Sequence, residues 1–341
     1  MSTSPERIAR NVCALIFVFL PVYAAAAQTA TSRIVVAANS FLSTLDQNQR
    51  QSVLFRYDDE KQRVRWSNLP TTIVRRAGLS MGELNGAQRS AALALVSSTL
   101  SPRGFEKVQQ IMEGDQLLKS GEGNNMFGKN LYYISILGTP SEKDPWMLQF
   151  GGHHLALNIT IAGERGVLTP SLTGAQPALY TINGKTVRPL GQESDKAVAL
   201  LNALDDTQRK QAILSYRLAD LVLGPGQDGK TIQPEGLQAS AMNERQRGML
   251  LDLISEWANI AQESAAAARM AELKADINET WFAWSGPATV TPGKNIAAYY
   301  RIQGPHLVIE YAPQRLGGDP AMHVHSMYRD PTNDYGRKPT K

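Results

Sequence analysis

The feature that most constrains the fold is an internal repeat. The segment LDQNQRQSVLFRY (45–57) is matched by LDDTQRKQAILSY (204–216), at a shift of 204 − 45 = 159 residues. Further matches follow in the same order: Asn85 with Asn243, Gly138 with Gly286, and Gly152, His154 and Leu155 with Gly304, His306 and Leu307. Because chance similarity rarely keeps its order over several blocks, the chain is predicted to contain two copies of one unit.

Each copy is predicted to be a helical hairpin followed by β-strands. Asp46 and Asp205 are suitable helix N-caps, and apolar residues at helical spacing follow them. A second helix is expected near Asn85 and near Asn243. Strand-like runs follow at 131–137, 146–161, 280–286 and 295–312. The expected class is α+β, with the strands of both halves forming a shared antiparallel sheet.

We expect a single duplicated domain over residues 34–341. Its parts are repeat one (41–161), a Gly- and Pro-rich linker (163–193), repeat two (200–314) and a His-rich C-terminal segment (321–336). Within the linker, Asn183-Gly184 predicts a hairpin turn. The sequence GPGQDG (224–229) follows a helix rather than a strand, which predicts a loop and not a dinucleotide site. The alanine-rich run ESAAAARMAEL (263–273) predicts a helix.

Residues 1–27 have the pattern of a secretory signal peptide. Arg7 and Arg10 precede the apolar run VCALIFVFLPVYAAAA (12–27), which ends in small residues. A membrane anchor is the alternative, although this run is short for a span. Cleavage would remove Cys13, the only cysteine, so the mature chain is expected to be secreted or periplasmic, without a thiolate and without a membrane span. The net charge of +4 comes from scattered residues and argues against a nucleic-acid partner.

The histidines suggest a site. The repeat aligns His154 with His306 and Asn158 with Glu310. Because side chains alternate along a strand, each histidine is expected to share a face with its polar neighbour four residues later. His153 is an addition of the first copy. We therefore expect His154 and His306 to approach each other across the shared sheet.

His323 and His325 form the remaining pair, and on a strand this i, i+2 spacing points both side chains the same way. Together with His154 and His306 they form a predicted ligand set for a divalent metal ion, zinc first and copper or iron as alternatives. A metal-free site for a polar ligand and purely structural histidines are the other interpretations. The residues expected to orient the ligand histidines are Arg329, Asp330 and Asp334.

The signal peptide and the segments FGGHHLALN, PSLTGAQP and HVHSMYRDPTNDYG together resemble a family of secreted bacterial and fungal proteins, the DUF3500 type of domain of unknown function. The resemblance covers nearly the whole mature chain. It implies that the two His-rich blocks belong to one module, and it implies no activity.

Two kinds of function remain open. A metal-dependent hydrolase or oxidoreductase would use Glu310 as a fourth ligand or general base, and His153 as a substrate contact or proton shuttle. A non-catalytic module would use the same pocket to capture a metal ion or a small polar ligand. The substrate, small molecule or polymer, is not identified by the sequence, and a purely structural interaction domain is the third alternative.

Overall fold

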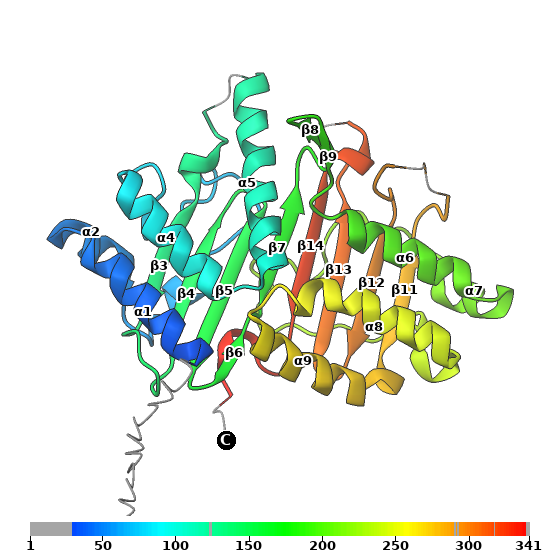
Figure 1. Ribbon diagram of the computed structural model, residues 1–341. Helices are drawn as coiled ribbons and strands as arrows, with labels where there is room; N and C mark the ends of the chain where they lie inside the picture. The colour runs from blue at the N-terminus through cyan, green and yellow to red at the C-terminus, as the bar shows by residue number, and fades with distance from the viewer. Residues whose placement is uncertain (1–28, 123–124, 290, 292, 317, 339–341) are drawn as a thin grey trace, which may run out of the picture.

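The computed structural model describes residues 29–122, 125–289, 291, 293–316 and 318–338 (Figure 1). The predicted signal peptide, residues 1–27, lies outside the described residues. None of the helices in the described part is long and apolar enough to cross a membrane.

A large, mostly antiparallel sheet forms the centre of the molecule, in the order β1-β3-β4-β5-β7-β14-β13-β12-β11-β10. Two short strands lie off this path: β2 pairs with β3, and β6 pairs with β5. The strands of the sheet are β1 (Leu54–Phe55), β2 (Leu79–Ser80), β3 (Tyr133–Leu137), β4 (Trp146–Gly152), β5 (Leu155–Ala162), β6 (Arg165–Val167), β7 (Ser171–Ala175), β10 (Leu237–Gln238), β11 (Trp281–Ser285), β12 (Tyr299–Gly304), β13 (Leu307–Pro313) and β14 (Val324–Arg329).

Helices cover one face of this sheet (Figure 1). Alternate strand residues such as Ile136, Leu148 and Ile159 point to the helices and form the apolar core with them, because successive strand side chains point to opposite faces. The helices of this layer are α1 (Ala30–Ser43), α2 (Gln47–Val53), α4 (Gly86–Ser98), α5 (Pro102–Glu122), α6 (Gly191–Ala203), α7 (Asp206–Ala212), α8 (Glu244–Ala258) and α9 (Glu263–Ala275). The short helix α3 (Glu60–Arg63) lies on the opposite face, where Gln62 bonds Gln149 of β4.

Two long connections cover the opposite face. We call residues 56–78 the first covering loop and residues 214–236 the second covering loop. Trp66 and Leu221, one from each loop, pack near Met147, Leu172 and Met327 of the sheet. This smaller apolar cluster lies under the loops, so both faces of the sheet are buried.

The two halves repeat the same order of elements. Helices α1, α2, α4 and α5 precede β3, β4, β5 and β7, and helices α6, α7, α8 and α9 precede β11, β12, β13 and β14. The second helices even have matching capping boxes, with Asp46 reaching Gln49 and Asp205 reaching Gln208. The α+β class and the shared, mostly antiparallel sheet are confirmed.

The segment expected to be a linker has a larger structural role. Residues 163–193 contain β6 and β7, and β7 lies at the middle of the sheet, where it pairs with β14 of the other half. The predicted turn at Asn183-Gly184 is confirmed, since it joins β8 (Tyr180–Ile182) to β9 (Lys185–Val187) in a separate hairpin.

Candidate metal centre

His153 and His154 occupy the two-residue turn between β4 and β5, rather than positions inside a strand. Gly152 and Leu155 close the turn as a cross-strand pair, and His154 has a left-handed backbone with φ of 60°. Strand alternation therefore does not decide where His154 points. The turn directs its imidazole toward β7, where Gly174 leaves room: a Cβ there would lie 3.1 Å from Cδ2 of His154.

Three histidines converge at this end of the sheet. Nε2 of His323 lies 2.9 Å from Nε2 of His154 and 3.2 Å from Nε2 of His325. One ring nitrogen from each of the three falls within 4.8 Å of the others, and all three residues are buried. We call these residues the histidine cluster. It could hold a metal ion, because neutral imidazole nitrogens are ligands of zinc, copper and iron.

The outer nitrogens of the cluster are held by oxygen atoms. Nδ1 of His323 donates to the carbonyl oxygen of Leu316 at 2.7 Å, and Nδ1 of His325 lies 3.4 Å from Oδ1 of Asp220. A carbonyl or carboxylate partner fixes the proton on Nδ1, which leaves the lone pair on Nε2. His323 therefore directs the lone pair of its Nε2 into the cluster, where a cation would satisfy it. The ring of His325 has both kinds of partner, because Nδ2 of Asn68, a donor, also lies 3.2 Å from its Nδ1.

Burial favours the neutral form of two of these imidazoles, those of His154 and His323. It lowers the pKa of His154 well below its ordinary value, and the neighbouring His153, His325 and His323 lower it further. Burial also lowers the pKa of His323 to about 4, although its hydrogen bond to Leu316 opposes the shift. Neutral imidazole is the form that binds metal, so these two ligands need no deprotonation near neutral pH.

His153 lies beside the cluster and has its own carboxylate. Its ring packs on the ring of His154 with centroids 3.7 Å apart, and its Nδ1 lies 2.7 Å from Oδ1 of Asp115. Asp115 also accepts a hydrogen bond from the backbone N–H of Gly128 at 2.8 Å. The carboxylate thus orients the imidazole and leaves Nε2 of His153 as the basic nitrogen.

His306 lies at the other end of the sheet, so the expected meeting with His154 is wrong. Three antiparallel pairings separate β5 from β13, which reverses the direction of β13 relative to β5. Equivalent strand starts therefore fall at opposite ends. Nδ1 of His306 instead lies 2.9 Å from the hydroxyl of Thr332.

Glu310 also lies away from the cluster and serves a structural role. Its carboxylate is fully buried and accepts hydrogen bonds from the backbone N–H groups of Val222 and Leu223 and from the hydroxyl of Tyr299, each at 2.7 Å. Burial raises its pKa against the effect of these hydrogen bonds. With its oxygens occupied, Glu310 anchors the second covering loop and is not placed to be a ligand or a general base.

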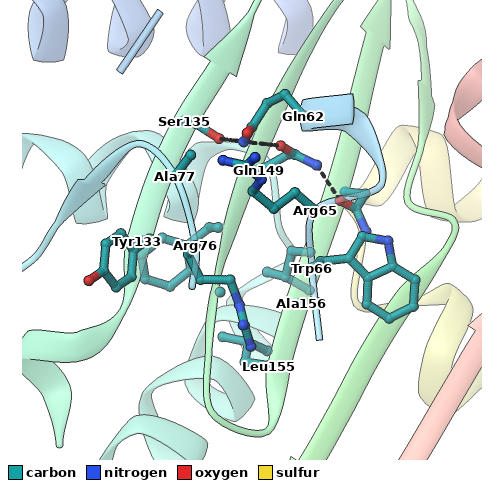
Figure 2. A pocket seen from close by; sticks show the side chains of 14 residues that line it. Gln62, Arg65, Trp66, Arg76, Ala77, Tyr133, Ser135, Gln149, Leu155 and Ala156 are labelled. Atoms are coloured by element: carbon teal, nitrogen blue, oxygen red, sulfur yellow. Dashed lines mark hydrogen bonds between the residues drawn. The ribbon is translucent and has the colours of Figure 1, made fainter. Parts of the chain in front are cut away.

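Asn158, the counterpart of Glu310 in the first half, anchors the first covering loop. Its Oδ1 accepts from Gln149 at 2.8 Å, and Gln149 accepts in turn from Gln62 of the loop at 3.0 Å (Figure 2). The cavity beside these residues measures only about 30 Å³. That volume admits water and excludes a substrate.

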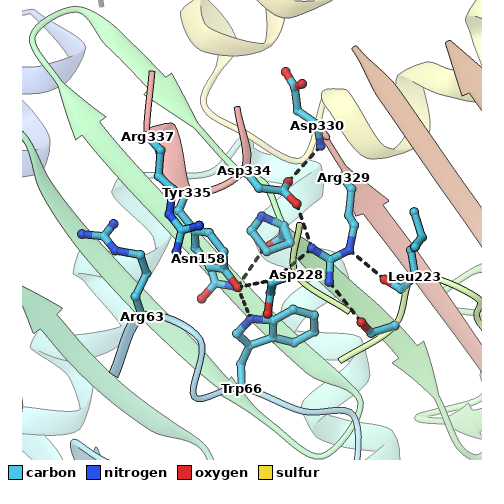
Figure 3. Close-up of polar contacts among 12 residues, drawn as sticks. Arg63, Trp66, Asn158, Leu223, Asp228, Arg329, Asp330, Asp334, Tyr335 and Arg337 are labelled. Atoms are coloured by element: carbon cyan, nitrogen blue, oxygen red, sulfur yellow. Dashed lines mark hydrogen bonds and ion pairs between the residues drawn. The ribbon is translucent and has the colours of Figure 1, made fainter. Parts of the chain in front are cut away.

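The three polar residues expected to orient the ligand histidines form a separate network near the C-terminus (Figure 3). Arg329 is buried and binds Asp228 at 3.0 Å, Asp334 at 2.7 Å and the carbonyl oxygens of Leu223 and Gly224. Asp330 pairs with Arg269 at 3.1 Å. The predicted contact of Arg329, Asp330 and Asp334 with the ligand histidines is therefore wrong. They lie at the far end of β14.

The sequence did not reveal the groups that do orient the histidines. Asp115 lies in the long helix α5, and Asn68 and Asp220 lie in the two covering loops. None of these residues has a fixed spacing to a histidine. Only the order of the strands brings them together, and no local pattern marks them.

The fold and the site together define an α+β protein with a buried cluster of three histidines at one end of a shared sheet. A family model described as "Protein of unknown function (DUF3500)" matches residues 27–337, so the chain belongs to this family, as the sequence resemblance indicated. No curated protein and no solved structure gives a significant match to the chain.

Proposed function

We propose that the protein binds one divalent metal ion through His154, His323 and His325. The observation that carries this proposal is the convergence of three buried imidazole nitrogens within 4.8 Å. In a tetrahedral zinc site with Zn–N distances of about 2.0–2.1 Å, ligand nitrogens lie about 3.3 Å apart. The separations of 2.9 and 3.2 Å from His323 to its two neighbours are close to that value, and the distance between His154 and His325, which is at most 4.8 Å, would have to adjust toward it when an ion binds.

The ligand set favours a catalytic type of site. Three protein nitrogens leave a coordination position for water or a substrate oxygen, whereas structural zinc sites use four protein ligands. Such an ion activates bound water for hydrolysis. His153, oriented by Asp115 and packed on His154, is the group we assign as the proton acceptor. Hydrolysis with zinc is the function we propose, and copper or iron would support an oxidoreductase instead.

Metal analysis tests the binding proposal. Protein purified without a histidine tag should contain about one metal ion per chain when measured by inductively coupled plasma mass spectrometry, as expected for a single three-histidine site. The His323→Ala/His325→Ala double variant should lose this metal, whereas His306→Ala should keep it because His306 lies at the other end of the sheet. Equal metal content in all three proteins would reject the histidine cluster as the site.

A hydrolysis assay separates the enzyme from the non-catalytic module. Zinc-loaded protein is compared with chelator-treated protein on 4-nitrophenyl acetate and on a phosphodiester such as bis(4-nitrophenyl) phosphate. We expect metal-dependent turnover that falls in His153→Ala while the metal content stays unchanged. Stoichiometric metal without turnover of either compound would favour the module that captures a metal ion or a small ligand.

We also propose export and internal duplication. The basic and apolar pattern of residues 1–27 supports export to the periplasm or beyond, and a mature N-terminus near Gln28 would test it. The repeated element order and the matching capping boxes support an internal duplication. Superposition of residues 41–161 on 200–314 in an experimental structure is the corresponding test.

A further inference from the structure

We propose that an extended peptide segment binds beside β6 as an added strand, in a cavity at the opposite end of the sheet from the histidine cluster. The ligand class is a peptide in β conformation, recognised mainly through its backbone. This binding site is separate from the proposed metal centre and does not depend on it.

The sheet has room for one more strand at this point. In the middle of the sheet, β7 and β14 lie between β5 and β13. Farther along, β6 takes the place of β7 beside β5, with Thr160 opposite Val167 and Ala162 opposite Arg165. The strand β14 ends at Arg329, and the chain then turns at Asp330 instead of continuing beside β6. Beyond the end of β14, no strand of the described residues therefore lies next to β6 on the side away from β5.

Among the described residues, the outer edge of β6 makes no backbone hydrogen bond, and the nearest one joins the N–H of Tyr335 to the carbonyl oxygen of Thr169 just after the strand. Within the described chain, the backbone of residues 164–168 pairs only with β5. Arg165 and Gly166 are exposed and Val167 is half-buried. An unpaired strand edge offers a row of N–H and C=O groups to another extended chain, which is the basis of strand addition in peptide recognition.

A cavity of about 760 Å³ adjoins this edge. That volume lies within the range of cavities that bind small organic molecules and short peptides. Its lining includes residues 164–169, which contain β6, and Ala265 and Ala268 of the alanine-rich run, where Ala265 packs on β6 with its Cβ 3.5 Å from the position of a Cβ at Gly166. Short alanine side chains leave the space open, which gives this segment a role beyond its helix propensity.

The inner end of the cavity is polar. Arg269 pairs with Asp330 at 3.1 Å, and its Nε donates to the hydroxyl of Tyr328 at 3.2 Å. The charged residues of the lining balance, with three acidic and three basic side chains: Glu164, Glu272, Asp330, Arg165, Arg269 and Lys338. A lining without net charge suits a polyamide backbone better than a simple anion or cation.

Peptide selection tests the proposal. A random heptapeptide phage library is selected on the full chain, and the most enriched peptide is labelled with fluorescein for anisotropy measurements. Ala268→Trp fills the cavity and should weaken binding by about tenfold or more, whereas the neighbouring exposed Ala267→Trp, which does not line the cavity, should change it by less than about twofold. Hydrogen exchange should slow at Arg165–Val167 when the peptide is bound.

Two further measurements make the test decisive. Methylating alternate backbone amides of the peptide should abolish binding, because strand addition needs those N–H groups. Chelator treatment should leave the affinity unchanged, because the histidine cluster is not involved. Three outcomes would each overturn the proposal, whatever the metal analysis shows. The two tryptophan variants could bind the peptide equally well, or the methylated peptide could still bind. The selection could also yield no peptide that binds the unaltered chain better than it binds the Ala268→Trp variant.

Discussion

At the residue scale, the partner of one ring nitrogen decides what the other can do. His323 gives its Nδ1 proton to the carbonyl of Leu316, and His153 gives its Nδ1 proton to Asp115. In the function we propose, the first histidine acts as a ligand and the second as a base, although both are buried imidazoles. Residue type alone does not distinguish these roles, and the contacts do.

The metal-free protein should lose stability as the pH falls from about 6.5 to about 4. Burial lowers the pKa of His323 to about 4 and that of His154 well below 6.5. In this interval the unfolded chain takes up protons that the folded chain does not, so the free energy of unfolding decreases and levels off below the folded pKa. At about 1.4 kcal/mol per pKa unit, the change from 6.5 to about 4 corresponds to at most about 3.5 kcal/mol for His323, and solvent screening of this incompletely buried ring reduces the effect to roughly 2–3 kcal/mol.

Urea unfolding of chelator-treated protein across this pH range measures the effect. His323→Gln should show a flatter dependence, since glutamine does not titrate. An equally steep dependence in the variant would show that other groups are responsible.

At the element scale, the β4–β5 turn and the end of β7 shape the cluster together. Periodicity suggested one strand-like run over 146–161, but the chain reverses at His153 and His154. Alternation of side chains was therefore the wrong guide to His154, because a turn residue obeys turn geometry. The same rule did bring His323 and His325 to one side, because His323, just before β14, has extended backbone angles (φ −141°, ψ 118°) that continue the strand.

Gly174→Ala should damage both stability and metal binding. A Cβ at Gly174 would lie 2.8 Å from the carbonyl oxygen of Val324 and 3.1 Å from the ring of His154. Overpacking of this kind costs about 1–3 kcal/mol. We expect a lower melting temperature and weaker zinc binding by competitive titration.

The matched control is Gly248→Ala in α8. No atom lies within 4 Å of a Cβ at this exposed helical position, so alanine should stabilise the protein by about 0.5–1 kcal/mol. A neutral result for Gly174→Ala together with this gain would show that the β7 backbone moves away from His154 at little cost.

At the scale of the whole molecule, the arrangement of the two halves explains both the success and the failure of the sequence predictions. The repeated blocks predicted the element order and the shared sheet. They could not predict whether the strands of the two halves run parallel or antiparallel to each other where the halves join. Because β7 and β14 pair antiparallel, the two halves run in opposite directions across the middle of the sheet. His154 and His306 therefore lie at opposite ends, and of the four predicted ligands only His154, His323 and His325 come together.

Arg329 links both covering loops to the C-terminal segment, so its loss should affect the whole molecule. Its guanidinium binds Asp228 and Asp334 and lies 5.6 Å above the ring of Trp66. Arg329→Met leaves two carboxylates without their cation and should lower the free energy of unfolding by about 3–5 kcal/mol. Arg337→Met, which removes a half-exposed partner of Glu60, should cost less than about 1 kcal/mol. Chemical denaturation of the two variants checks this, and similar losses would show that Arg329 is not a central link.

The covering of the histidine cluster has a consequence for the rate at which metal is exchanged. The three imidazoles are buried. Asn158 holds the first covering loop to the sheet through Gln149, and Glu310 holds the second covering loop. If the cluster binds a metal ion as we propose, this burial predicts that loading and release follow the rate at which the covering segments open rather than the affinity. A metal acquired during folding would then be retained long after its supply changes, and the compartment in which the chain folds would decide which metal it carries.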